Sequence, residues 1–226
     1  MATRVFLAMV IVCCVLSVAV ADDLAPPVWR GQPGSTFQAW EFGTGENPAY
    51  PSALNNPYGT PCAVIDYDPP FGTGWIEGTE WSDVYGSKRG WWDIGTGSIT
   101  ITIPNTVNTA PDTYKDIRIQ ITYWQDISDA PSVNVLPGGV HIGETQHSLV
   151  EAGPTGGGWY SMLADWRLVP NPSCETIIIA ADPMWGSMID EVVVDTICTA
   201  VPEPGSLAVL ATGVLGLAGL AFRRRS

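Results

Sequence analysis

Positive charge is scarce in this chain of 226 residues, which holds ten Lys and Arg against 23 Asp and Glu. Arg4 and three arginines at the C-terminus account for four of the ten, so residues 22–200 carry a net charge of about −16. A protein that binds nucleic acid needs a basic face for the phosphates. We therefore exclude nucleic acid as a partner and interpret the acidity as typical of a soluble, exported protein.

Common catalytic motifs are absent as well. The sequence has no Gly-x-Ser-x-Gly nucleophile elbow, no phosphate-binding loop and no Gly-x-Gly-x-x-Gly after a strand. Its two histidines lie in His141-x-x-Glu144-x-x-His147, which is not the His-Glu-x-x-His pattern of zinc proteases. On a strand the two histidines would share one face about 20 Å apart, with Glu144 on the other. We expect ordinary surface histidines there rather than a zinc site.

Helical periodicity is missing between residues 22 and 200, whereas β-strand patterns recur. The clearest strand is 98–103, where Ile alternates with Ser and Thr. Further strands are predicted at residues 36–42, 63–67, 116–124, 132–136, 161–169, 176–180 and 191–197, separated by clusters of Gly and Pro. Because 43–90 is too long for bare loops, it should contain irregular structure or unrecognised strands. The pattern predicts an all-β fold: a single antiparallel β-sandwich of jelly-roll topology over residues 22–200.

Residues 1–21 are typical of a secretory signal peptide. Arg4 gives a basic start, residues 5–18 are apolar, and Ala19-Val20-Ala21 offers a small-residue cleavage site. The apolar run is short and a cleavage site follows it, which favours a signal peptide over a membrane anchor.

The C-terminus combines a proline-braced motif, an apolar run and a basic cluster. In order these are Val201, Pro202, Glu203 and Pro204, then residues 207–222, then Arg223, Arg224 and Arg225. Both prolines fix φ and lack an N–H, so the motif should be an extended, solvated peptide. The apolar run would rise roughly 24 Å as a helix, slightly short of a bilayer core of about 30 Å. The arginines stay cytoplasmic by the positive-inside rule, which places the preceding domain across the membrane.

This tail resembles the PEP-CTERM sorting signal of bacterial envelope proteins in the order, spacing and terminal position of its parts. The resemblance covers residues 201–226 only. It implies an exosortase-type processing enzyme as a partner, which recognises the Pro-Glu-Pro motif. It also implies transit through the inner membrane, followed by delivery to the cell envelope, the cell surface or the extracellular matrix.

Three cysteines remain once the signal peptide is removed: Cys62, Cys174 and Cys198. An oxidising envelope favours pairing, and an odd count leaves one over. If residues 176–180 and 191–197 form a hairpin centred near Gly186, Cys174 and Cys198 face each other. A bridge there would contribute about 2–4 kcal/mol. The alternative is a pair of buried thiols.

Acidic clusters offer two kinds of site. Oxygen ligands suit Ca²⁺, so Asp66, Asp68, Asp190 and Glu191 are candidates for a structural calcium site, the alternative being solvated acidic loops. Glycoside hydrolysis needs two carboxylates roughly 5–10 Å apart, which a tryptophan-rich segment offers at Glu77, Glu80 and Asp83.

Tryptophan is over-represented, with ten residues between Trp29 and Trp185. Trp91 and Trp92 are adjacent, so on an extended backbone they point to opposite sides and cannot both enter one core. Trp124 would share a polar strand face with Arg118 and Gln120, opposite the Ile117-Ile119-Ile121 face. An exposed indole beside hydrogen-bonding groups can hold a pyranose ring, so these residues are the candidate glycan-binding site. The alternative is a tryptophan covered by a long loop.

These observations predict a non-catalytic, exported protein that acts as a structural or glycan-binding matrix module. The main alternative is a polysaccharide-active hydrolase or lyase that uses the clustered carboxylates. A third possibility is a structural protein that binds no small ligand.

Overall fold

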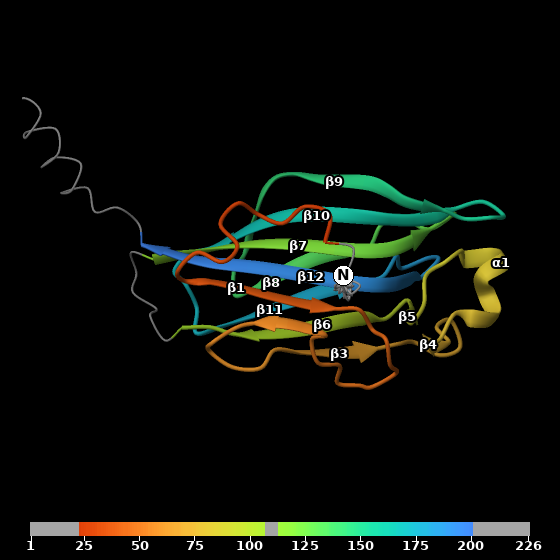
Figure 1. The fold of residues 1–226 in the computed structure, drawn as a ribbon, viewed down its shortest axis with the longest axis horizontal. Coiled ribbons are helices and arrows are strands. Elements are labelled where there is room, and N and C mark those ends of the chain that lie inside the picture. Colours follow the sequence, from red (N-terminus) through yellow and green to blue (C-terminus); the bar gives the residue numbers. More distant parts are fainter. Residues whose placement is uncertain (1–22, 107–112, 201–226) are drawn as a thin grey trace, which may run out of the picture.

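Antiparallel strands form nearly all the regular structure in the computed structural model, which describes residues 23–106 and 113–200. The large sheet has the order β2 (Ala53–Asn55), β1 (Ser35–Trp40), β12 (Ser187–Ala200), β7 (Thr113–Gln125), β10 (Gly158–Leu168), β9 (Val140–Ala152); β5 (Trp91–Gly95) also pairs with β12, and β4 (Gly74–Ile76) with β5. The small sheet has the order β3 (Cys62–Asp66), β6 (Ser98–Pro104), β11 (Cys174–Ala180), β8 (Ser132–Leu136). Figure 1 shows this arrangement, with one helical segment formed by η1 (Thr79–Trp81) and α1 (Ser82–Tyr85). The all-β prediction is confirmed.

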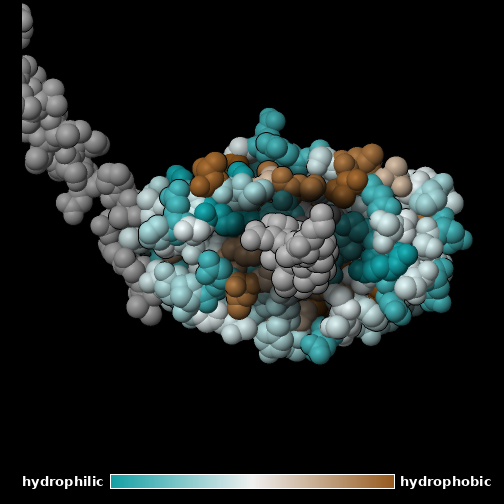
Figure 2. Space-filling model, in the orientation of Figure 1, coloured by the Kyte–Doolittle hydropathy of each residue, from teal (hydrophilic) through white to brown (hydrophobic). Residues whose placement is uncertain are grey.

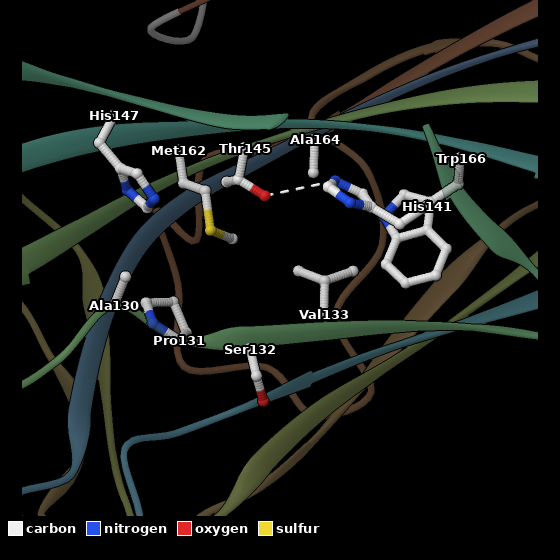
Figure 3. A pocket seen from close by; sticks show the side chains of 10 residues that line it. All are labelled: Ala130, Pro131, Ser132, Val133, His141, Thr145, His147, Met162, Ala164 and Trp166. Atoms are coloured by element: carbon white, nitrogen blue, oxygen red, sulfur yellow. Dashed lines mark hydrogen bonds between the residues drawn. The ribbon is translucent and has the colours of Figure 1, made fainter. Parts of the chain in front are cut away.

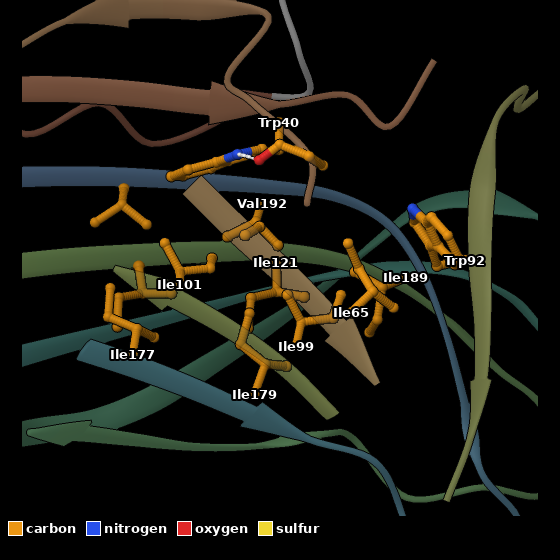
Figure 4. Close-up of a cluster of buried hydrophobic side chains, with 14 of the residues drawn as sticks. Trp40, Ile65, Trp92, Ile99, Ile101, Ile121, Ile177, Ile179, Ile189 and Val192 are labelled. Carbon is orange, nitrogen blue, oxygen red and sulfur yellow. Dashed lines mark hydrogen bonds between the residues drawn. The ribbon is translucent and has the colours of Figure 1, made fainter. Parts of the chain in front are cut away.

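One hydrophobic cluster is shared by the two sheets (Figure 4). Alternate residues of β6 and β11 point into it, and so do those of β7 and β12: Ile99, Ile101, Ile103, Ile177, Ile179, Ile117, Ile119, Ile121, Val192 and Val194. Each such side chain stabilises the fold by about 1.5–3 kcal/mol when fully buried. The predicted faces of 98–103 and 116–124 are therefore confirmed.

β9 is the outermost strand of the large sheet and most of its residues are exposed. Apolar side chains gather along this edge, where Val140, Ile142 and Leu149 are all exposed (Figure 2). The sequence patterns did not predict β9, nor did they predict β5. The expectation for 43–90 was irregular structure or unrecognised strands, and the structure places the strands β2 and β4 there.

The predicted hairpin between 176–180 and 191–197 is wrong. β11 pairs with β6 and β8 in the small sheet, whereas β12 pairs with β1, β5 and β7 in the large sheet. The reason is burial: Val192, Val193 and Val194 are all buried, so this run is covered on both faces and takes a central position. Gly186, at φ +77°, turns the chain from one sheet to the other against the backbone of Gly95.

The predicted disulfide between Cys174 and Cys198 is wrong as well, because it depended on the hairpin. Cys174 and Cys198 lie in different sheets, and both are free thiols, as is Cys62. Cys174 is exposed, whereas the thiol of Cys198 donates to Asn105 Oδ1 at 3.2 Å. Burial raises the pKa of the Cys198 thiol.

A buried ion pair joins the sheets near the end of β12. Lys115 Nζ on β7 lies 2.6 Å from Glu175 Oε1 on β11, and both side chains are fully buried. Cys198 is the neighbour of Lys115 across the β7–β12 pairing. Burial raises the pKa of Glu175. This end of the interior is therefore polar, in contrast to its isoleucine-rich middle.

The predicted signal peptide, the Pro-Glu-Pro motif and the transmembrane sorting helix fall outside the described residues. Within 23–106 and 113–200, no helix is long and apolar enough to cross a membrane.

Candidate functional site

A cleft of about 380 Å³ opens between β8 of the small sheet and β9 and β10 of the large sheet (Figure 3). Its lining consists of Ala130, Pro131, Ser132, Val133, His141, Thr145, His147, Met162, Ala164 and Trp166. The floor is mainly apolar, and the two histidines of the chain lie at its β9 side. Its volume falls in the range of about 300–1,000 Å³ that is typical of small-ligand sites.

The sequence of β10 explains why the cleft exists. Met162, Ala164 and Trp166 alternate along β10 and face the cleft. The small Ala164 lies between two large side chains, so the middle of this face is hollow. Val133 faces it from β8 without filling it.

The pairing of β9 with β10 places the histidines beside the large side chains. His141 is paired with Trp166, and its ring centroid lies 5.2 Å from the indole. His147 is paired with Met162. Each end of the cleft thus combines an imidazole with an apolar side chain.

Each imidazole is held by a hydroxyl group. Thr145 Oγ1 lies 3.3 Å from His141 Nε2, and Tyr123 Oη lies 3.0 Å from His147 Nδ1. Burial raises the pKa of Tyr123 to about 12, so its phenol keeps its proton at neutral pH. Both rings therefore have one nitrogen engaged by the protein and one left for a ligand.

The prediction for the histidine motif is partly confirmed. His141 and His147 share one face of a strand and are exposed, as expected, and Glu144 does not line the cleft. What the spacing did not reveal is that this face borders a cavity. In the described part of the chain, no group of three or more His, Cys, Asp or Glu could hold a metal ion.

The predicted stacking platform at Trp124 is wrong, although the strand face was assigned correctly. Trp124 is only 4% exposed and packs with Trp91 and Trp159 in a second cluster on the outer face of the large sheet. Tyr85 of α1 covers it, with ring centroids 5.0 Å apart. The turn at Gly153 covers it too, since a Cβ there would lie 2.3 Å from the indole.

Trp91 and Trp92 do point to opposite sides, as predicted. Trp91 belongs to the outer cluster, and Trp92 belongs to the core between the sheets. Both are buried, so neither is available to a polysaccharide.

Arg118 and Gln120 are covered by the start of the described chain. The guanidinium of Arg118 donates to both carboxylate oxygens of Asp165 at 2.8 Å and to Ala25 O at 3.3 Å. Gln120 Oε1 accepts from the backbone N–H groups of Leu24 and Ala25, at 3.1 Å each. These polar side chains therefore hold the segment after the predicted cleavage site against the sheet.

The calcium candidates lie in separate parts of the fold: Asp66 in the small sheet, Asp68 in the loop after it, and Asp190 and Glu191 in the large sheet. Asp66 is the last residue of β3, and Asp68 Oδ2 accepts from Thr96 Oγ1 at 2.5 Å. Asp190 Oδ2 lies 3.0 Å from Lys88 Nζ, and burial raises the pKa of Asp190 to about 6.

Glu191 follows Asp190 on β12. Burial and the adjacent Asp190 raise its pKa to about 8. Asp190 thus lies beside a lysine, and within the described chain these four residues form no group of three or more potential metal ligands.

The carboxylates weighed for hydrolysis lie on the surface, outside the cleft. Glu77 follows β4, Glu80 lies in η1 and Asp83 lies in α1, and all three are exposed. None of them lines the cleft.

The sequence did not reveal the cleft because only one of the two large-sheet strands that border it, β10, has a recognisable strand pattern. Trp166 lies within a predicted strand, and its partner strand β9 has too polar a sequence to be recognised. The even spacing of His141, Thr145 and His147 is the signal that could have found it, since such residues share one strand face.

Comparison with known families adds a finding at the C-terminus. The family described as "PEP-CTERM protein-sorting motif" matches residues 200–225. This segment carries the sorting signal of exported envelope proteins, which exosortases process. No curated protein and no solved structure matches the chain.

Proposed function

We propose that this exosortase-sorted protein is a non-catalytic β-sandwich module, of jelly-roll type, that binds polysaccharide in the cleft between β8, β9 and β10. It would serve as a structural or glycan-binding component of the cell surface or the extracellular matrix. The observation that carries this proposal is the joint placement of Trp166 and His141 in an open cavity of about 380 Å³.

The chemistry of the cleft suits a sugar. The apolar C–H face of a pyranose can lie on Trp166 and Met162, while its oxygens reach the imidazoles. Contacts between two aromatic side chains contribute about 0.5–1.5 kcal/mol beyond the burial of their area. We assume a contribution of similar size for a sugar ring on Trp166. Single sites would bind weakly, and a surface displaying many copies would bind a polymer by avidity.

The proposal is tested by retention on polysaccharides. The exported protein should be retained by a polysaccharide gel that resembles its matrix, and Trp166→Ala should weaken retention about tenfold at most. Trp185→Ala is the matched control, because Trp185 is 59% exposed and lies outside the cleft. Equal retention of the two variants would contradict the assignment of the cleft.

The same samples distinguish a binder from an enzyme. A binder leaves the chain length of the polysaccharide unchanged after long incubation. Shortened chains that depend on Glu77, Glu80 or Asp83 would support the alternative of a hydrolase or lyase.

Addition of a calcium chelator should lower the midpoint of thermal unfolding if the expected structural Ca²⁺ is present.

The sorting signal predicts a change in mass. After processing, the mature protein should lack Arg223, Arg224 and Arg225, because an exosortase cuts at the Pro-Glu-Pro motif. Intact-mass analysis of the native exported protein checks this and also reports any attached group. A full-length C-terminus in protein that resists extraction from the inner membrane would instead indicate a permanent anchor.

A further inference from the structure

The hydrogen-bonding side chains of the cleft are unusual for a site that binds neutral sugars. Neutral sugars present many hydroxyl donors, which side-chain carboxylates and carboxamides accept well. No Asp, Glu, Asn or Gln is among the residues that line this cleft. Its polar side chains are instead imidazoles and hydroxyl groups.

Each imidazole of the cleft has one ring nitrogen beside a hydroxyl group, and the ring tautomer decides which of the two donates. The single proton of Tyr123 Oη can go to Gln125 Oε1 at 3.4 Å or to His147 Nδ1 at 3.0 Å. When it goes to His147, the proton of the neutral ring resides on Nε2. When Thr145 donates to His141 Nε2, the proton resides on Nδ1. The cleft then offers two N–H donors above an apolar floor, and a ligand with strong acceptors would satisfy them.

The basic side chains of the described chain all have partners elsewhere in the protein. Five of its six basic side chains are ion-paired with carboxylates: Arg30 with Asp23 and Asp195, Lys88 with Asp190, Lys115 with Glu175, Arg118 with Asp165, and Arg167 with Asp116. The sixth, Arg89, donates to the carbonyl oxygens of Gly86 and Lys88. No lysine or arginine is among the residues that line the cleft, so a ligand bound there faces the two imidazoles.

We infer that the cleft preferentially binds the carboxylate-bearing sugars of an acidic polysaccharide, such as uronic acids, and that protonation of His141 and His147 strengthens this binding. The inference rests on the proposed glycan-binding function and specifies its ligand. The ring of a uronic acid would lie on Trp166, and its carboxylate would accept hydrogen bonds from the imidazoles. A sugar carboxylate stays ionised between about pH 5 and pH 8, so a change in binding across that range reports on the protein.

The other ionisable groups near the histidines do not compete for this role. Tyr123 lies beside His147, and burial raises the pKa of its phenol to about 12. Tyr160 packs against Tyr123, with ring centroids 6.3 Å apart. Asp129 precedes the rim residue Ala130, and its backbone N–H donates to Asp182 Oδ2. Asp129 and Glu144 are exposed and do not line the cleft.

The test is calorimetric titration of the mature protein with oligogalacturonate and with its methyl ester. The two probes share a sugar ring and a length and differ in charge. We expect oligogalacturonate to bind about tenfold more tightly at about pH 5.5 than at about pH 8, since each exposed charge pair contributes up to about fivefold. The methyl ester should bind with the same affinity at both pH values.

Variants assign the effect to the histidines. The double variant His141→Gln, His147→Gln should bind oligogalacturonate at about pH 5.5 no more than twofold tighter than at about pH 8. Glu144→Gln, on the same strand but outside the cleft lining, is the matched control and should keep the full pH dependence. A melting curve at both pH values shows that each variant is folded.

Three results would overturn the inference. Equal binding of the acid and the ester means that the cleft does not select carboxylates, while the proposed glycan-binding function stands. Preference for the acid without pH dependence means that the imidazoles are not its cationic partners. If neither probe binds at either pH and neutral polysaccharides are not retained, the glycan-binding function itself is wrong.

Discussion

The two faces of the large sheet both carry tryptophans, which are buried on the outer face and border a cleft on the inner face. On the outer face, Trp124 and Trp159 are buried beneath α1 and the turn at Gly153. On the inner face, Trp166 remains half-buried and borders the cleft. The strand alternation assigns each residue to a face, but segments far away in the sequence decide whether that face is covered. An aromatic residue on a polar strand face is therefore weak evidence for an exposed site.

The largest expected effect concerns the outer cluster. Trp159 is fully buried, and its Nε1 donates to Tyr85 O at 2.7 Å. Trp159→Ala should lower the free energy of unfolding by about 3–5 kcal/mol, because it opens a cavity and loses this hydrogen bond. Trp166→Ala should cost only about 1–2 kcal/mol, because the indole already borders a cavity. Urea denaturation measures both, and similar costs would remove the contrast between the two faces.

A smaller effect is expected where the N-terminal segment covers the outer face. Gln120→Ala leaves the N–H groups of Leu24 and Ala25 without their acceptor, which should cost about 1–3 kcal/mol. Hydrogen exchange should accelerate at these two amides while the amides of β7 stay protected. Gln146→Ala, on exposed β9, is the control and should change neither quantity. Unchanged exchange at Leu24 would show that Gln120 does not hold the segment.

The smallest effect concerns the thiols. Because Cys62, Cys174 and Cys198 are free, reductant should leave the unfolding midpoint unchanged. Alkylation should reach the exposed Cys174 before Cys198, whose thiol is part-buried and donates to Asn105. Peptide mapping without reductant checks the state of each thiol. Recovery of a linked Cys174–Cys198 peptide would contradict the sheet assignment of β11 and β12.

The sequence predicts strands well where one face is buried. β6 and β7 alternate apolar and polar residues because each has one face in the core, and both were located. β9 has neither face buried, so its apolar and polar residues do not alternate regularly. It is nevertheless a long strand, because its backbone pairs with β10. The candidate site lies on this strand, which is why its residues could not be assembled from the pattern alone.

Strand partners were harder to predict than strands. Cys174 and Cys198 lie symmetrically about Gly186, and symmetry in sequence suggested a local hairpin. The run at Val193 is apolar on both faces, however, and such a run gains most by lying between two neighbours in the large sheet. The free energy of burial therefore outweighed the proximity of the two segments along the chain.

The central position of β12 also governs how the domain would carry a load. β12 ends at residue 200, immediately before the sorting motif, and it is hydrogen-bonded along its length to β1 and β7. Hydrogen bonds between antiparallel strands run perpendicular to the strand axis. A pull along that axis would therefore stress many of them together in shear, and not one after another as in unzipping. Were the processed protein attached through its C-terminus, this geometry would make the last strand a mechanically strong attachment.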